Sequence, residues 1–140
     1  MALRIDWEGL IVGFESRSQQ ITHFFDRETG DVEQVLVRDE ARHTRMSADE
    51  RYLALPRDRG ERSLGDLEEF LPRCEDSACR RELERALQAA GSAAVYRDAL
   101  TRYPKEEARF FQFKEHQALE RAQAWLREMG IPFPLPTRDA

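Results

Sequence analysis

The 140-residue chain has few of the residues that usually disclose a function. It contains two cysteines and three histidines, and no apolar stretch approaches the 18 or so residues that a membrane-spanning helix needs. Near the start, Asp6 and Glu8 interrupt the apolar run that a secretory signal would require. We therefore expect a cytoplasmic protein that has no membrane partner.

The two cysteines give little support for a metal site. Cys74 and Cys79 form a single C-x4-C pair, no second pair exists, and His43 is far away in the sequence. A structural zinc ion needs four ligands at suitable spacing. We interpret the two thiols as reduced core residues, because free cysteine is commonly buried. No cofactor and no metal are expected.

Catalytic motifs are also lacking. The sequence contains no G-x-S-x-G, no P-loop and no H-E-x-x-H. His23, His43 and His116 fall in a predicted strand, a predicted loop and a predicted helix, so they could meet only through the fold. Among the functions considered, a small enzyme of unknown type therefore comes third.

Charge is what the chain has in quantity. Charged residues make up 35% of it with a net charge of −5, yet large apolar residues recur at regular spacing, which indicates a solvated surface rather than disorder. Arg57, Arg59 and Arg62 lie close together, and an arginine and aromatic surface makes nucleic-acid binding the second function considered. Nucleic-acid-binding faces are usually strongly basic, and these arginines alternate with acids, which argues against it.

Residues 1–56 predict a helix and a small antiparallel sheet. Asp6 is suited to cap a helix whose apolar face would be Trp7, Leu10, Ile11 and Phe14, although Gly9 and Gly13 weaken that prediction. The stretch "QQITHFFDRETGDVEQVLV", residues 19–37, then alternates apolar and polar residues around a polar turn. It predicts a hairpin with Gly30 at positive φ. Asp26 and Thr29 should bond the backbone of that turn.

The hairpin is followed by a polar stretch and a short apolar run. Residues 38–50 have almost no apolar content and predict a loop, with one helical turn around residues 47–50 as an addition. Tyr52 to Leu55 predicts a third strand that Pro56 ends, because proline has no N–H for a sheet ladder. A third strand and a covering helix would make the hairpin stable.

Residues 63–130 show helical periodicity and predict about four helices. Their expected boundaries are a cap at Ser63 with Asp66, a break at Pro72, a cap at Asp76 or Ser77, an end at Gly91, a start at Ser92, Pro104 as the first residue of the last helix, and a stop at Gly130. The last helix should carry an apolar stripe of Phe111, Ala118, Ala122, Trp125 and Met129. Residues 131–140 are expected to be a loose tail.

Together these elements predict one α+β domain over residues 1–140. An N-terminal helix and a small sheet, made of a hairpin and a short third strand, would pack on a C-terminal bundle of about four helices. Neither part is expected to cover its apolar surface alone.

The order of the motifs resembles a known family. An aromatic strand precedes "DRETGDV", and "ERYLALP", "ERALQAAGSAAVYRDAL", "RYPKEEARFFQF" and "AQAWLREMGIPF" follow. From about Ile5 to Phe133 this is similar to uncharacterised protein family 0158, a group of small bacterial proteins. The resemblance implies no activity, substrate or cofactor. Arg97 and Asp98 occupy matching places, whereas Phe110 and Phe111 stand where the family tends to have a tryptophan and an aromatic residue.

Four residues are candidates for a binding site: Arg51, Tyr52, Arg97 and Asp98. The two arginines flank tyrosines, and they could contact an anion or a partner between the sheet and the helices. Alternatively, each could pair with a carboxylate, for example Asp98 or Asp26, which we favour because a buried arginine usually needs a bidentate acid. The leading function is a non-catalytic interaction or regulatory module with a protein partner at a free sheet edge. The oligomeric state is left open.

Overall fold

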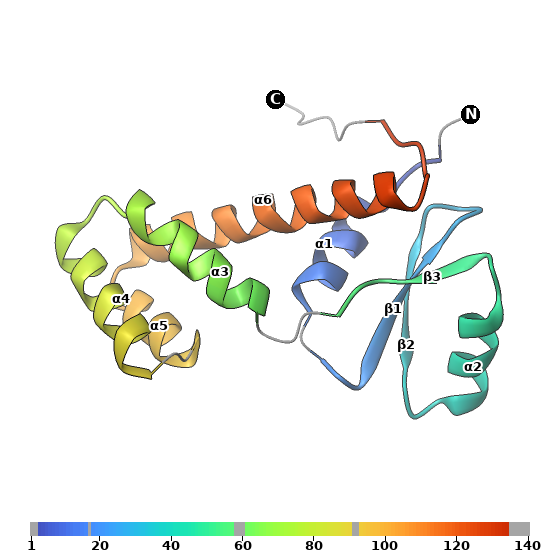
Figure 1. Ribbon diagram of the computed structural model, residues 1–140, viewed down its shortest axis with the longest axis horizontal. Helices are drawn as coiled ribbons and strands as arrows, with labels where there is room; N and C mark the ends of the chain where they lie inside the picture. Colours follow the sequence, from blue (N-terminus) through green and yellow to red (C-terminus); the bar gives the residue numbers. More distant parts are fainter. Residues whose placement is uncertain (1–2, 17, 58–60, 91–92, 135–140) are drawn as a thin grey trace. The chain divides into compact units, whose positions relative to one another are not determined.

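The computed structural model describes residues 3–16, 18–57, 61–90 and 93–134 (Figure 1). The chain forms two compact units: unit 1 comprises Met1–Arg57 and Ala118–Ala140, and unit 2 comprises Asp58–Gln117. Unit 1 contains α1 (Trp7–Glu15), β1 (Ile21–Asp26), β2 (Val32–Leu36), α2 (Glu40–Ala48), β3 (Tyr52–Ala54) and the second half of α6 (Pro104–Glu128). Unit 2 contains α3 (Glu61–Phe70), the 3-10 turn η1 (Leu71–Arg73), α4 (Ser77–Ala90), α5 (Ala93–Leu100) and the first half of α6. The predicted α+β class is confirmed.

The sheet of unit 1 is antiparallel, with β1 in the centre between β2 and β3. Alternation along β1 sends Phe25 to one face and Phe24 to the other. Phe25 joins a core formed with α1 and the second half of α6, whereas Phe24 packs with Val35 and with Met46 of α2. The sheet is therefore covered on both faces, by α1 and α6 on one side and by α2 on the other (Figure 1).

The two glycines of α1 allow the helix to lie close to the sheet. The Asp6 side chain caps the helix as predicted and accepts a hydrogen bond from the Gly9 N–H at 3.0 Å. A Cβ on Gly9 would come within 2.9 Å of Val32 Cβ, and a Cβ on Gly13 would meet Leu55 and His23. The unfavourable helix propensity of glycine is thus offset by close packing between helix and strand.

The hairpin turn has the predicted chemistry. Gly30 has φ +81°, and a Cβ at this position would collide with the carbonyl oxygen of Arg4. Asp26 Oδ1 accepts from the N–H of Glu28 at 2.9 Å, and Thr29 Oγ1 accepts from the N–H of Asp31 at 3.2 Å. Glycine is required here by both the backbone conformation and the close approach of the N-terminal segment.

The prediction of a loop over residues 38–50 is wrong, because Glu40–Ala48 forms α2. This helix buries one large apolar side chain, Met46, and sets the His43 ring edge-on to Phe24 at 5.6 Å. Because only one large apolar residue of these nine is buried, the sequence of α2 shows no apolar stripe with helical period. Residues 41–46 nevertheless include alanine, methionine and two arginines, which are good helix formers.

Unit 2 has its own core, which includes Leu67, Phe70, Leu83, Tyr96 and Phe110. As predicted, α3 ends before Pro72, and Asp76 caps α4 by accepting from the N–H groups of Ala78 and Cys79. Two predictions need correction: α3 begins at Glu61, two residues before Ser63, and the side chain of Phe111 is exposed. Gly91 and Ser92 lie outside the described residues.

The last helix belongs to both units. It begins at Pro104 as predicted, and its second half places Ala118, Ala122 and Trp125 in the core of unit 1. Met129, predicted for the same stripe, is 41% exposed. Among the described residues, no helix has both the length and the apolar character that a membrane crossing needs.

The C-terminal end of α6 is fixed by the predicted stop. Gly130 has φ +72°, the Ile131 N–H donates to the carbonyl of Leu126 at 2.9 Å, and the Gly130 N–H donates to the carbonyl of Arg127 at 3.1 Å, which is a Schellman motif. Ile131 is buried and Phe133 packs edge-on against Trp7 at 5.3 Å. The tail is therefore not loose from residue 131, and residues 135–140 lie outside the described part.

Candidate functional site

The outer edge of β2 is the first feature of functional interest. The Asp26 N–H donates to the Asp31 carbonyl and the Val37 N–H donates to the Gln20 carbonyl, both at 2.8 Å. In an antiparallel ladder, this alternation turns the N–H and C=O groups of Val32, Gln34 and Leu36 away from β1. The Leu36 carbonyl accepts from the Asp39 N–H at 3.0 Å. For the other outward groups, the described residues supply no backbone partner.

Exposed apolar side chains lie beside this edge. Leu36 is 40% exposed and Val37 is 38% exposed. Gln34, the middle residue of β2, is exposed as well. Charges are also near: Glu33 faces Arg42 of α2 at 3.8 Å. The edge therefore combines free backbone groups with a few apolar contacts, and its charges limit self-association.

Arg51 and Tyr52, two of the predicted site residues, lie where β3 begins, next to the hairpin turn. Arg51 holds Asp26 in a bidentate pair, with Nε 2.9 Å from Oδ1 and Nη2 2.8 Å from Oδ2, and its guanidinium lies over the Tyr52 ring. The pKa of Asp26 is lowered from 3.8 to about 2, and the hydrogen bond from Arg51 is the largest cause of this shift. For Arg51 the structure thus shows the carboxylate pair that we favoured, and the pair joins the turn to β3.

Arg97 and Asp98, the other two, lie on α5 in unit 2, and both are exposed. Their neighbour Tyr96 is fully buried and donates its hydroxyl to the Leu67 carbonyl at 3.3 Å. The four predicted residues therefore belong to two different units. That they form one binding site stays a prediction.

A second polar cluster, which sequence reasoning missed, lies at the start of β1. Arg57 donates from Nη2 to Thr22 Oγ1 at 2.6 Å and from Nη1 to the Gln19 carbonyl at 3.2 Å. On its other side, Thr22 Oγ1 lies 2.9 Å from His43 Nε2. No local spacing signals this cluster, because its members are up to 38 residues apart.

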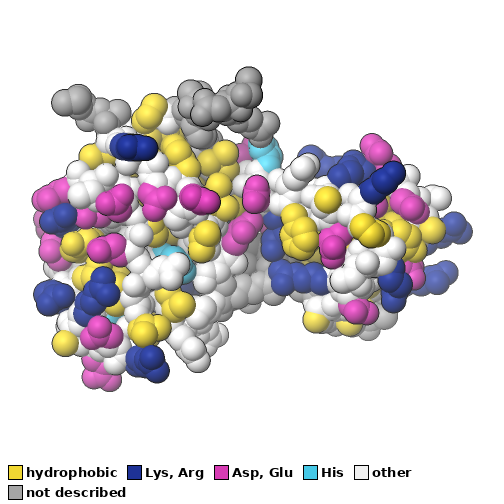
Figure 2. All heavy atoms as spheres, turned by 180° about the vertical axis from the view of Figure 1, so that it is seen from behind, with side chains coloured by type: hydrophobic (Ala, Val, Ile, Leu, Met, Phe, Trp, Pro, Cys, Tyr) yellow, Lys and Arg dark blue, Asp and Glu magenta, His cyan; other side chains and the backbone are white. Residues whose placement is uncertain are grey.

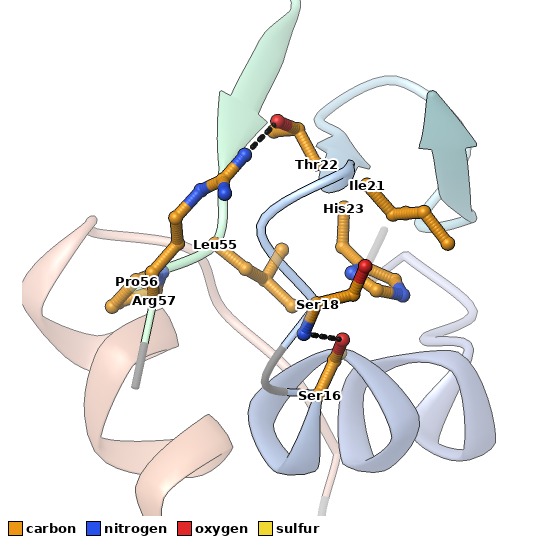
Figure 3. Close-up of a pocket in the computed structure, with 9 residues that line it drawn as sticks. Ser16, Ser18, Ile21, Thr22, His23, Leu55, Pro56 and Arg57 are labelled. Carbon is orange, nitrogen blue, oxygen red and sulfur yellow. Dashed lines mark hydrogen bonds between the residues drawn. The ribbon is translucent and has the colours of Figure 1, made fainter. Parts of the chain in front are cut away.

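Figure 3 shows the small pocket beside this cluster, with Arg57 reaching Thr22 and with His23 near Ser18. Burial is the main cause that lowers the pKa of His23, and the charge of Arg57 lowers it further, so the neutral form of this ring predominates at pH 7. The pocket has a volume of about 10 Å³, which is room for about one water molecule. The cluster is therefore suited to fixing the start of β1 rather than to holding a substrate.

The described residues contain no group of three or more His, Cys, Asp or Glu side chains that could hold a metal ion. Cys74 and Cys79 are both buried and unpaired, as predicted. Burial is the main cause that raises the pKa of both thiols. For Cys74 the neighbouring Glu106 carboxylate raises the pKa further. Thiols with raised pKa values are poor nucleophiles at neutral pH.

Several arginines of the surface are paired with acids. Arg42, Arg102 and Arg109 contact Glu33, Glu82 and Glu106, and Figure 2 shows Lys and Arg side chains interspersed with Asp and Glu on the face that it presents. Arg57 is described above, whereas Arg59 and the side chain of Arg62 lie outside the described part.

These features define a small α+β protein with a three-stranded antiparallel sheet whose outer β2 edge is open, and its described residues include no group of side chains that could hold a metal ion. The chain belongs to an uncharacterised protein family (UPF0158), whose family model matches residues 2–136. The predicted resemblance is confirmed, and the family description assigns no activity. Neither a search of curated proteins nor a search of solved structures finds a match.

Proposed function

We propose that this protein is a non-catalytic interaction module that binds an extended segment of a partner protein as an additional strand on β2. The observation that carries the proposal is the set of outward N–H and C=O groups at Val32 and Gln34, together with the outward N–H of Leu36. Unpaired groups of this kind are the template that strand addition uses.

The chemistry of the edge indicates what the partner segment would look like. Residues directly opposite on neighbouring strands share a face of the sheet, so a side chain next to Leu36 would bury apolar surface. A segment with alternating apolar residues fits this requirement. The unpaired cysteines suit the reducing cytoplasm, where the proposal places the protein.

Gln34 provides a specific test, because its N–H points away from β1. Proline at position 34 would remove the outward donor and block an added strand, while the ladder between β1 and β2 would stay intact. Gln34→Ala removes the side chain but keeps the N–H, and serves as the matched control. Tagged wild-type protein and the two variants would be used to capture proteins from a cell lysate.

The proposal predicts a protein that wild type and Gln34→Ala retain and Gln34→Pro loses. Circular dichroism and the melting temperature must show that Gln34→Pro is folded. Equal capture by all three proteins, or no capture by any of them after cross-linking, would argue against strand addition at β2.

A further inference from the structure

Unit 1 contains a cavity of about 250 Å³ on the face of the sheet that α2 covers, here called the α2 face. Its lining comes from β2, from α2 and the residue that follows it, and from β3: Glu33, Arg42, Arg45, Met46, Asp49 and Tyr52. Sites for drug-sized ligands occupy about 300–1,000 Å³, so this cavity is better suited to one long side chain than to a whole small molecule. All of the lining belongs to one unit of the chain.

A strand added to β2 would send every second side chain to the α2 face. Glu33 is paired with Phe24, which packs with Met46 of α2, so Glu33 lies on this face. A residue directly opposite Glu33 on an antiparallel added strand would share the face, with its Cβ about 5 Å from the Cβ of Glu33. One side chain of a bound segment would therefore lie at the cavity.

The charged groups of the cavity favour an acidic side chain at this place. Its two acids are engaged, since Glu33 faces Arg42 at 3.8 Å and Asp49 Oδ1 accepts from the Arg51 N–H at 2.9 Å. Arg45 is exposed, and no described residue forms an ion pair or a hydrogen bond with its guanidinium. A guanidinium of this kind can bind an incoming carboxylate in a bidentate pair.

We propose that the segment bound on β2 carries a glutamate on the α2 face, and that its carboxylate pairs with Arg45. The proposal rests on strand addition at β2, the function proposed above, and names the side chain that the edge selects. The methylene groups of the glutamate would lie against Met46 and Tyr52. Glu33 repels a second carboxylate on this face, whereas the two arginines attract it, so the test must distinguish the two signs of charge.

The opposite face of the added strand has a different requirement. Val32 is paired with Phe25, which belongs to the core under α1, so Val32 and Leu36 lie on the face that α1 covers. Neighbouring side chains of an added strand on that face would be apolar. The partner is thus an extended segment with apolar residues on one face and a glutamate in the middle of the other.

Three capped peptides of seven residues provide the probes. Each has valine at the odd positions and threonine at the second and sixth, and they differ only in the central residue, which is glutamate, glutamine or lysine. Each would be titrated into the full-length protein and followed by backbone amide NMR. The glutamate peptide should bind about three to five times more tightly than the glutamine peptide, and the lysine peptide should bind most weakly. Equal affinity for the glutamate and glutamine peptides, or tightest binding of the lysine peptide, would overturn the proposal.

Two arginine substitutions test whether Arg45 is the source of the preference. Arg45→Gln should bring the affinities of the glutamate and glutamine peptides to within about 1.5-fold of each other. Because Arg45 is exposed, its replacement should leave the fold unchanged. Arg4→Gln makes the same change of charge at an exposed position of unit 1 outside the cavity, and should keep the wild-type preference. A preference that survives Arg45→Gln, or that Arg4→Gln removes as well, would overturn the pairing with Arg45.

Gln34→Pro separates this proposal from the one on which it rests. Binding that prefers glutamate and is lost in folded Gln34→Pro supports both. If Gln34→Pro loses all three peptides but wild type binds them equally, strand addition stands and the glutamate preference is refuted. If no peptide binds to wild type, or if Gln34→Pro binds them as well as wild type does, strand addition on β2 fails and the glutamate preference fails with it.

Discussion

The ion pair between Asp26 and Arg51 should stabilise unit 1 by an amount that the structure allows us to calculate. The carboxylate is buried, and its pKa falls from 3.8 to about 2 on folding. At 1.36 kcal/mol for each pKa unit, this shift corresponds to about 2.5 kcal/mol. Arg51 has a side chain that is 37% exposed, so solvent screens the pair. We expect Asp26→Asn to lower the free energy of unfolding by about 1–2.5 kcal/mol at pH 7.

The pH dependence gives the same prediction a second form. The folded-state pKa of Asp26 is lower than its unfolded value, so the stabilisation is complete above about pH 5. It is lost as the pH falls toward 2, because protonation then removes the charge from the folded protein. The difference in unfolding free energy between wild type and Asp26→Asn should therefore shrink steadily between pH 5 and pH 2.

Urea titration followed by tryptophan fluorescence measures this quantity in the correct part of the chain, because Trp7 and Trp125 both belong to unit 1. Glu28→Gln is the matched control. Glu28 contacts the same arginine at 3.2 Å but is 67% exposed, and its loss should cost less than about 0.5 kcal/mol. An unchanged urea midpoint for Asp26→Asn, or a difference that persists at pH 2, would refute the reasoning.

Three further predictions concern the core and the turn. Gly30→Val should lower stability by about 3 kcal/mol or more, because a β-branched residue resists φ +81° and its Cβ would meet the Arg4 carbonyl; an unchanged melting temperature would show that the turn is different. Cys74 and Cys79 should react with Ellman's reagent only after unfolding, and their double replacement by alanine should leave a folded protein; loss of folding or release of a metal would contradict this. A fragment of residues 63–140 lacks the sheet that covers the second half of α6, so it should be molten or aggregated, and a cooperative thermal transition by circular dichroism would argue otherwise.

Local features of the fold could be predicted from the sequence because their physical causes are local. The caps at Asp6 and Asp76 and the positive-φ glycines at positions 30 and 130 depend on residues a few positions apart. In contrast, α2 was missed because Met46 is the one large apolar side chain that this helix buries. The division of α6 between two units was also missed, since periodicity shows that a helix has an apolar stripe but not what covers it.

The candidate sites show the same limit. The neighbouring Tyr52 drew attention to Arg51 in the sequence, and the bidentate partner of Arg51, Asp26, lies 25 residues away. The cluster of Arg57, Thr22 and His43 has no sequence signature, because three separate segments contribute to it.

Amide hydrogen exchange along β2 tests the central claim, a free outer edge, most directly. In the purified protein, the N–H groups of Glu33 and Val35 point toward β1 and should exchange slowly. Those of Gln34 and Leu36 point outward and should exchange much faster, at rates close to those of exposed loops. Protection of Gln34 equal to that of Val35 at micromolar protein concentration would show that the edge is already covered, and would contradict the account.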